Sequence, residues 1–200
     1  NSIVLVLNTC NAMQFKTIAT YPIDSVLWVG TGGTMSFRAL ADVLTGKADP
    51  SGRLADTYLY DNYSAPSTVN TGNFTYAQSN GVPATETYSH NTKYVVYQEG
   101  IYNGYRYTET RYEDKVLNTA KTGEFNYDSV VAYPFGYGLS YTQFEYSAFK
   151  VDYNEKTDVY TVRVTVKNVG AAKGKESVQI YLQKPYTDYD RENGVGKSAV

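Results

Sequence analysis

Few residues of this sequence have the type and spacing that catalysis or metal binding requires. His90 is the single histidine, and no cysteine or acidic cluster at metal-ligand spacing accompanies it. Structural and catalytic zinc sites need three or four such ligands, so we predict no metal site. Cys10 is the single cysteine, which excludes an internal disulfide. Because it follows a hydrophobic run, it is predicted to be a small buried core residue.

A glycine-rich loop at residues 30–34 (GTGGT) lies between a predicted strand and a predicted helix. Free amides at a helix N-terminus can bind a phosphate, so a nucleotide-binding protein is one alternative. The spacing matches neither GxGxxG nor GxxxxGK[ST], and the acidic ribose-binding residue at the end of the next strand is missing. We therefore favour a structural turn and predict no cofactor site.

Three charged residues could face a ligand or form structural pairs. Arg53 follows a tight turn, where its forked donors can bind a carboxylate or a sugar-facing loop, and we favour pairing with an acid. Glu99 and Arg106 either pair with each other or face a cleft, and again we favour a structural role. Five tyrosines either stack on sugar rings or, as alternating aromatic residues on strands, form core and sheet surface, which we favour: Tyr94, Tyr97, Tyr102, Tyr105 and Tyr107.

The amino-acid composition limits the kinds of partner that this chain can attract. The 200 residues include 18 basic and 20 acidic side chains, giving a net charge of -2. Such a balance provides no field to attract nucleic acid or an anionic membrane. No run approaches the roughly 18 apolar residues of a membrane span. The 22 tyrosines are unusual and suit extended sheets and sugar-binding surfaces alike.

The first part of the chain has an α/β pattern. Residues 2–8 (SIVLVLN) and 25–30 (SVLWVG) are apolar runs typical of parallel strands buried on both faces. A short helix is expected within residues 11–21. Phe37, Leu40, Ala41 and Leu44 form a helical apolar stripe, and Gly46 stands where a left-handed C-terminal cap belongs.

Loops dominate the middle of the chain. Residues 61–91 are rich in Asn, Ser, Thr, Gly and Pro and are predicted to form a long loop. A strand is expected at residues 93–97 and a second polar loop at 118–128. Residues 133–142 (YPFGYGLSYT) combine aromatic side chains with two glycines and a proline, which indicates an ordered aromatic turn.

From Phe144 onward the apolar period is two. Alternation at residues 161–167 and again at 178–183 predicts half-buried strands of an antiparallel sandwich. A sandwich of the immunoglobulin or fibronectin type needs about seven strands and roughly 100 residues, whereas only about three are visible. We therefore predict an α/β part at residues 1–140 and an incomplete all-β part at 141–200, with both chain ends as cut edges of something larger.

Five segments occur in the order found in glycoside hydrolase family 3, which the chain therefore resembles over nearly its whole length: residues 40–53 (LADVLTGKADPSGR), 99–106 (EGIYNGYR), 133–142 (YPFGYGLSYT), 164–170 (VTVKNVG) and 174–182 (GKESVQIYL). The resemblance implies the C-terminal part of the α/β sandwich domain followed by the start of a fibronectin type III-like domain. It also implies a TIM-like barrel elsewhere in the same polypeptide.

The resemblance implies retaining hydrolysis by two carboxyl groups about 5 Å apart. The family's nucleophile is an aspartate in a Ser-Asp-Trp stretch of the barrel, and its acid is a glutamate in a Gly-Glu-Gly-like loop. Neither motif is present, and Trp28 is flanked by Leu27 and Val29. Glu99 belongs to the separate Glu-Gly-Ile-Tyr pattern. We therefore predict no catalytic residue, no cofactor-binding residue and no metal ligand in this chain.

The leading hypothesis is thus a fragment of an exo-acting β-glucosidase-like enzyme that hydrolyses terminal β-linked glucosides or xylosides. The fragment itself is predicted to be inactive. The alternative is a non-catalytic carbohydrate-binding or adhesion module, which the tyrosine content favours. For the location we predict the outside or surface of a bacterial cell rather than the cytoplasm.

Overall fold

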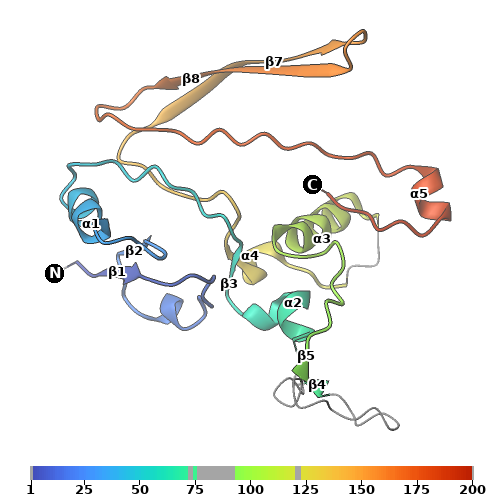
Figure 1. Ribbon diagram of the computed structural model, residues 1–200, viewed down its shortest axis with the longest axis horizontal. Coiled ribbons are helices and arrows are strands. Elements are labelled where there is room, and N and C mark those ends of the chain that lie inside the picture. The colour runs from blue at the N-terminus through green and yellow to red at the C-terminus, as the bar shows by residue number, and fades with distance from the viewer. Residues whose placement is uncertain (1, 72–73, 76–92, 120–122, 200) are drawn as a thin grey trace, which may run out of the picture.

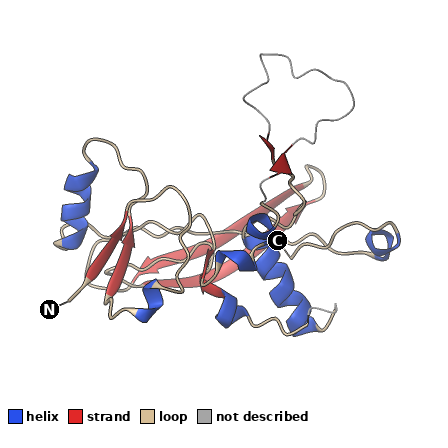
Figure 2. Ribbon diagram, turned by 90° about the horizontal axis from the view of Figure 1, so that it is seen from below, coloured by secondary structure: helices blue, strands red, loops and turns tan. Residues whose placement is uncertain are grey.

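The computed structural model describes residues 2–71, 74–75, 93–119 and 123–199. Its first strands and helix lie on one side of the molecule, and the helices of the middle segment lie on the other (Figure 1). A long hairpin of the last part stands apart from both, and an extended stretch runs from it to a short helix near the C-terminus (Figures 1 and 2).

The first layer has the predicted α/β arrangement. Strands β1 (Val4–Leu7) and β2 (Ser25–Trp28) pair in parallel, and α1 (Ser36–Leu44) follows. Gly46 has φ +73°, which confirms the left-handed position after the helix. The prediction that both strands are buried on two faces is wrong, because only Leu7 of β1 is buried and none of β2 is. Among the described residues no third strand joins this pair, and Phe37 of α1 is 75% exposed.

A small aromatic core joins this layer to the middle segment. The segment after β1 contains a single 3-10 turn, η1 (Ile18–Thr20), within the range 11–21 where a short helix was expected. Its Phe15 packs edge-on against Tyr58 and Tyr133, with ring centroids 5.5 and 5.0 Å apart. These tyrosines lie on β3 (Tyr58–Leu59) and β6 (Val131–Tyr133), which pair antiparallel. Tyr133, the first residue of the aromatic turn predicted at 133–142, thus packs against this core.

The stretch expected to be one long loop contains regular structure in its described residues. A 3-10 turn η2 (Asn62–Ser64) is capped by Asp61, and α2 (Pro66–Val69) follows with proline at its first position. Strand β4 (Phe74–Thr75) pairs with β5 (Lys93–Tyr94), which is shorter than the predicted strand at 93–97. Short polar turns of this kind lack the periodic apolar pattern that marks longer elements.

Helix α3 (Tyr105–Leu117) was not predicted, and it corrects the expectation that Tyr105 and Tyr107 alternate on a strand. Gly104, with φ +55°, precedes the helix, and Asn118 ends it in the left-handed region. The buried residues of α3 are Thr108 and Thr110, so it has no apolar stripe to reveal it. Helix α4 (Tyr127–Val130) begins within the last two residues of the polar loop expected at 118–128.

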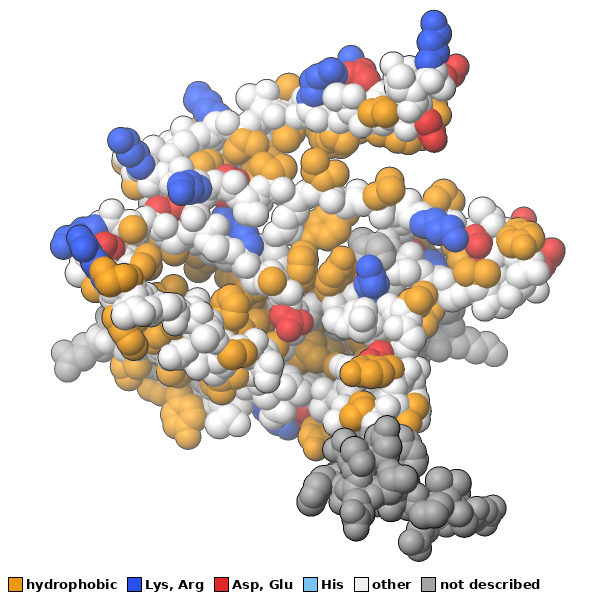
Figure 3. Space-filling model, viewed as in Figure 1, with side chains coloured by type: hydrophobic (Ala, Val, Ile, Leu, Met, Phe, Trp, Pro, Cys, Tyr) orange, Lys and Arg blue, Asp and Glu red, His pale blue; other side chains and the backbone are white. Residues whose placement is uncertain are grey.

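The last part is antiparallel, as predicted, and β8 (Val159–Asn168) contains the strand expected at 161–167; its partner is β7 (Phe144–Asn154). Between Ser147 and Lys150 strand β7 has one more residue than the facing stretch of β8, and Ala148 has φ +50°. This β-bulge reverses the alternation of β7. One face of the hairpin therefore collects apolar side chains from both sides of the bulge: Tyr146, Val151, Tyr153, Tyr160, Val162 and Val166. Apolar side chains gather on the edge facing the rest of the chain (Figure 3).

The strand predicted at 178–183 does not form. These residues are extended without ladder partners, and the alternating apolar side chains are exposed, Val178 by 43%, Ile180 by 66% and Leu182 by 88%. A period of two identifies a segment suited to a sheet, but pairing needs a neighbouring edge. The described residues provide none here.

A C-terminal arm returns along α3. Helix α5 (Asp188–Glu192) begins with a capping box formed by Thr187 and Asp190. Beyond it, Lys197 Nζ lies 2.7 Å from Glu113 Oε1 and 2.6 Å from Asp114 Oδ1, and these side chains are mostly buried. The Ala199 amide donates to Thr110 Oγ1 at 3.0 Å. The arm is therefore held by a charge cluster and a backbone contact.

This charge cluster predicts a defined pH dependence. Burial alone would raise the pKa of Asp114, but hydrogen bonds from Lys197 and Thr119 outweigh it and lower that pKa. Burial alone would lower the pKa of Lys197, but hydrogen bonds to Asp114 and Glu113 raise it. Asp114 therefore contributes to the stability of the fold above its unfolded pKa of about 3.9, and this stability is lost as the pH falls through the lower folded pKa. The stability contributed by Lys197 is lost only above about pH 10.4, as the pH rises through its raised folded pKa.

We expect Lys197→Met to lower the hydrogen-exchange protection of the Ala199 amide about tenfold, because a charged hydrogen-bond partner is removed from mostly buried carboxylates. The difference in protection between the variant and the wild type should be constant from about pH 5 to 9. It should begin to narrow below about pH 4 and vanish as the pH falls through the lowered pKa of Asp114. Lys156→Met in the exposed β7–β8 turn is the control. A loss equal to that of this control would contradict the assignment.

Within the described residues no helix combines the length and apolar character needed to cross a membrane.

Candidate functional site

A retaining glycosidase needs two carboxyl groups about 5 Å apart across an open site. Two hollows in the described part of the chain each contain a single carboxylate among their lining residues. The first, of about 380 Å³, lies between the start of α3 and the C-terminal arm and includes Arg106, Lys184 and Asp190. The second, of about 200 Å³, includes Asp56. Neither hollow has the pair that this chemistry requires.

The carboxylate of the first hollow is used by the protein itself. Asp190 Oδ2 accepts hydrogen bonds from the Thr187 amide at 2.9 Å and hydroxyl at 2.8 Å, and Oδ1 lies 3.6 Å from Lys184 Nζ. Backbone and side-chain hydrogen bonds from Thr187 lower the pKa of Asp190. A proton donor needs a raised pKa, so Asp190 is unsuited to be a general acid.

Glu99 and Arg106 do not form the ion pair that was one alternative. Arg106 Nη1 lies 3.5 Å from Asn103 Oδ1, and its side chain lines the first hollow. Glu99 is half-buried and is not among the residues lining that hollow; its carbonyl accepts from the Tyr102 amide at 2.9 Å. As predicted, Arg53, Glu99 and Arg106 do not converge on one open pocket.

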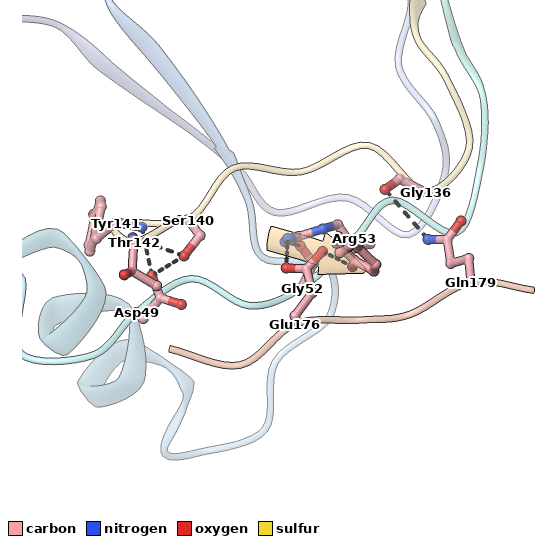
Figure 4. Close-up of polar contacts among 10 residues, drawn as sticks. Asp49, Gly52, Arg53, Gly136, Ser140, Tyr141, Thr142, Glu176 and Gln179 are labelled. Atoms are coloured by element: carbon pink, nitrogen blue, oxygen red, sulfur yellow. Dashed lines mark hydrogen bonds and ion pairs between the residues drawn. The ribbon is translucent and has the colours of Figure 1, made fainter. Parts of the chain in front are cut away.

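Arg53 pairs with an acid, as favoured, although the partner is remote in sequence. Its Nη2 lies 2.6 Å from Glu176 Oε2, and the two side chains are only 12% and 15% exposed. Tyr146 donates to the other oxygen, Glu176 Oε1, at 2.8 Å. Figure 4 shows the pair linking the turn after α1 to the extended stretch that follows β8. We call these three side chains the Arg53 latch.

Asp49 makes a second connection from the same turn, to the segment just before β7. Its Oδ1 accepts from the Ser140 hydroxyl at 2.8 Å and from the Tyr141 amide at 2.6 Å (Figure 4). The Tyr141 hydroxyl in turn donates to the Val43 carbonyl at 3.0 Å. Asp49 and Glu176 were not singled out from the sequence. Their positions in two of the five quoted motifs were the available signal.

The remaining candidates have structural positions or lie outside the described residues. Gly30 has φ +59°, and a side chain added there would meet the Trp28 ring at 3.2 Å, so this loop is a tight turn between β2 and α1. The prediction that Cys10 is buried is wrong, because β1 ends at Leu7 and Cys10 lies in the exposed segment after it. Its Sγ lies 2.7 Å from the Thr31 hydroxyl. His90 lies outside the described residues.

The five tyrosines are divided between packing and the surface. Tyr105 packs against Phe135 with ring centroids 4.5 Å apart, and the Tyr107 hydroxyl accepts from Arg111 at 2.9 Å. Tyr102 is half-buried, whereas Tyr97 is 82% exposed. The Tyr94 side chain lies outside the described part. The half-buried members therefore serve mainly in packing, as favoured, although two of them do so from a helix.

Comparison with known proteins matches this arrangement to one family. The model of the glycosyl hydrolase family 3 C-terminal domain matches residues 1–105. The chain is 35% identical over 185 residues to a β-glucosidase of Ruminococcus albus, covering 92% of this chain and 16% of that protein. It is equally identical over 185 residues to thermostable β-glucosidase B of Acetivibrio thermocellus, covering 20% of it.

Solved structures give the same result. β-Glucosidase 3B of Thermotoga neapolitana, in complex with α-D-glucose, is similar with a TM-score of 0.60 and 31% identity. The match covers 85% of this chain and 19% of that protein. A β-glucosidase of Paenibacillus barengoltzii has a TM-score of 0.60 and 28% identity, with coverage of 86% and 16%.

The fold and the matches define an α/β-type domain of the kind found in sugar-cleaving hydrolases. More specifically, the chain belongs to glycoside hydrolase family 3. It spans no more than about a fifth of the length of these β-glucosidase relatives.

Proposed function

We propose that this chain is a non-catalytic part of a retaining, exo-acting glycoside hydrolase that removes terminal β-linked sugars such as glucosides or xylosides. The observation that carries the proposal is the single carboxylate in each hollow, in a chain 35% identical to β-glucosidases over 92% of its length. Both catalytic carboxyl groups then come from other segments of the same polypeptide, including a TIM-like barrel.

We also propose a division near residue 140, with an α/β part before it and the start of a fibronectin type III-like sandwich after it. The β7–β8 hairpin supports this division because its apolar face suits the inner face of a sandwich. The exposed alternation of Val178, Ile180 and Leu182 supports a further strand that pairs when the remaining strands are present.

Exposed apolar residues of the α/β layer support contact with the rest of such an enzyme. Met35 and Phe37 at the start of α1 are 65% and 75% exposed, and Ile3 before β1 is 50% exposed. Patches of this kind mark interaction surfaces. A location outside or on the surface of a bacterial cell stays a prediction.

The complete polypeptide that contains this chain tests the proposal. We expect it to hydrolyse p-nitrophenyl β-glucoside or β-xyloside and to release first the β-anomer of the sugar, because two successive displacements retain the configuration. The anomer is identified by proton NMR before mutarotation. Release of the α-anomer first, or hydrolysis of neither substrate, would contradict the proposed function.

A further inference from the structure

Three segments that are far apart in the sequence meet at one place, which we call the three-segment junction: the turn after α1 (residues 49–54), the aromatic turn (136–143) and the stretch that leaves β8 (168–179). The first two segments exchange backbone hydrogen bonds. The Leu54 amide donates to the Tyr137 carbonyl at 2.8 Å, and the Gly136 amide donates to the Leu54 carbonyl at 2.7 Å. Asp49 adds a side-chain contact by accepting from the Ser140 hydroxyl at 2.8 Å (Figure 4).

The third segment contacts each of the other two. The Val169 amide donates to the Gln143 carbonyl of the second segment at 2.9 Å. The Thr142 hydroxyl donates to Asn168 Oδ1 at 2.7 Å. The Arg53 latch joins the third segment to the first through the ion pair with Glu176. Every pair of segments is therefore connected directly.

Glycines at the junction leave no room for a side chain. A methyl group added at Gly138 would lie 2.6 Å from the Gly52 carbonyl oxygen, across the contact between the first two segments. One added at Gly174 would lie 2.6 Å from Thr142 Cγ2 and 2.7 Å from Asp49 Oδ2, so it would meet both of the other segments. Separations under 3.0 Å force neighbouring atoms to move. The three segments are thus packed closely against one another.

This packing differs from the usual boundary between two independent domains. Such boundaries generally fall in exposed linkers that few contacts cross, and relative motion of the domains is then expected. The division proposed near residue 140 instead falls inside the junction, where Thr142 is only 7% exposed. Separating the two parts at this point would break contacts of all three segments.

We propose that residues 141–200 are a fixed brace of the α/β part and that the three-segment junction opens as one unit. Weakening the contact between any two segments then loosens the contacts that the third one makes. A carbohydrate-binding or adhesion module, the alternative considered from the sequence, would instead fold and move independently of the α/β part. The inference rests on the division near residue 140 and not on the proposed hydrolysis.

Hydrogen exchange in the complete polypeptide, which needs no substrate, tests this coupling with two reciprocal substitutions. Gly174→Ala in the third segment should lower the protection of the Leu54 amide, which bonds the first segment to the second. Gly138→Ala, whose methyl group meets the first segment, should lower the protection of the Val169 amide, which bonds the third to the second. Both losses should be roughly 10- to 100-fold, as for other overpacked contacts. Unchanged protection of the distant amide in either variant would overturn the proposal.

Gly52→Ala is the matched control, because it lies in the junction and a methyl group there meets nothing within 4 Å. The φ angle of Gly52 is not positive, so alanine is compatible with the backbone. The protection of both amides should be unchanged or slightly raised, since alanine restricts the unfolded chain. A loss equal to that in Gly174→Ala would show that the effect does not come from close packing, and it would overturn the proposal.

A gentler substitution keeps the test decisive if circular dichroism shows that the glycine variants do not fold. Thr142→Val preserves the shape of the side chain and removes its hydrogen bond to Asn168, between the second and third segments. The protection of the Leu54 amide should fall about 2- to 10-fold, the usual effect of losing one hydrogen bond. If this protection stays at the wild-type level, the junction does not open as one unit.

Discussion

The 200-residue chain, purified alone, is expected to hydrolyse aryl β-glucosides and β-xylosides no faster than the buffer background. Formation of an oxocarbenium-like transition state needs a nucleophile on one side of the glycosidic bond and a proton donor on the other. Removing both carboxyl groups leaves no route for the reaction, and the rate difference from the complete enzyme should span many orders of magnitude. The measurement is release of p-nitrophenol by equal molar amounts of the two proteins.

A misfolded fragment would also be inactive, so folding must be measured on the same sample. Circular dichroism of the fragment should show the helix and strand content of α1, α3 and the β7–β8 hairpin. A complete polypeptide with an Asp→Ala change at its barrel nucleophile is the control for background hydrolysis. Turnover by the folded fragment at a rate near that of the complete enzyme would place the catalytic carboxylates within this chain.

The Arg53 latch should contribute more to stability than any exposed ion pair of this chain. Arg53→Met leaves the carboxylate of Glu176 mostly buried, with the Tyr146 hydroxyl as its one remaining partner among the described residues. Breaking a buried pair in this way costs about 3 kcal/mol. Local opening of the adjoining turn should therefore become roughly 100-fold more frequent.

Hydrogen exchange in the complete polypeptide reports this opening. The Leu54 amide donates to Tyr137 at 2.8 Å and the Gly136 amide donates to Leu54 at 2.7 Å, so their protection should fall about 100-fold in Arg53→Met. Arg163→Met is the matched control, because Arg163 pairs with Asp152 on the hairpin surface at 61% and 38% exposure. Such an exposed pair contributes about 0–1 kcal/mol. Equal effects of the two changes would show that the latch has no special role.

The elements predicted correctly are those whose residues carry the signal locally. The stripe from Phe37 to Leu44 with Gly46 after it predicts α1, and the alternation from Thr161 to Lys167 predicts β8. The apolar runs that contain Leu7 and Trp28 predict the parallel strands β1 and β2. In each case the pattern follows from the backbone geometry of the element itself. It is therefore visible in the sequence even when the layer that packs on the element is missing.

The elements missed depend on contacts between distant segments. Helix α3 buries threonines rather than an apolar stripe, because the polar C-terminal arm packs on it through Lys197 and Ala199. The Arg53 latch joins residues 123 positions apart, which no local pattern reveals.

The bulge in β7 has a consequence for how this strand can evolve. Tyr146 and Val151 are five positions apart, an odd number that would place them on opposite faces of a regular strand, and the extra residue near Ala148 lets them share one face. Deleting that extra residue would leave them an even number of positions apart and still on one face, and adding a residue to the β7–β8 turn would leave every pair in place. Deleting Asp152 from the paired stretch, in contrast, would turn Tyr153 to the opposite face. Length variation among descendants of this sequence should therefore accumulate at the bulge and the hairpin tip and be purged from the paired stretches of β7.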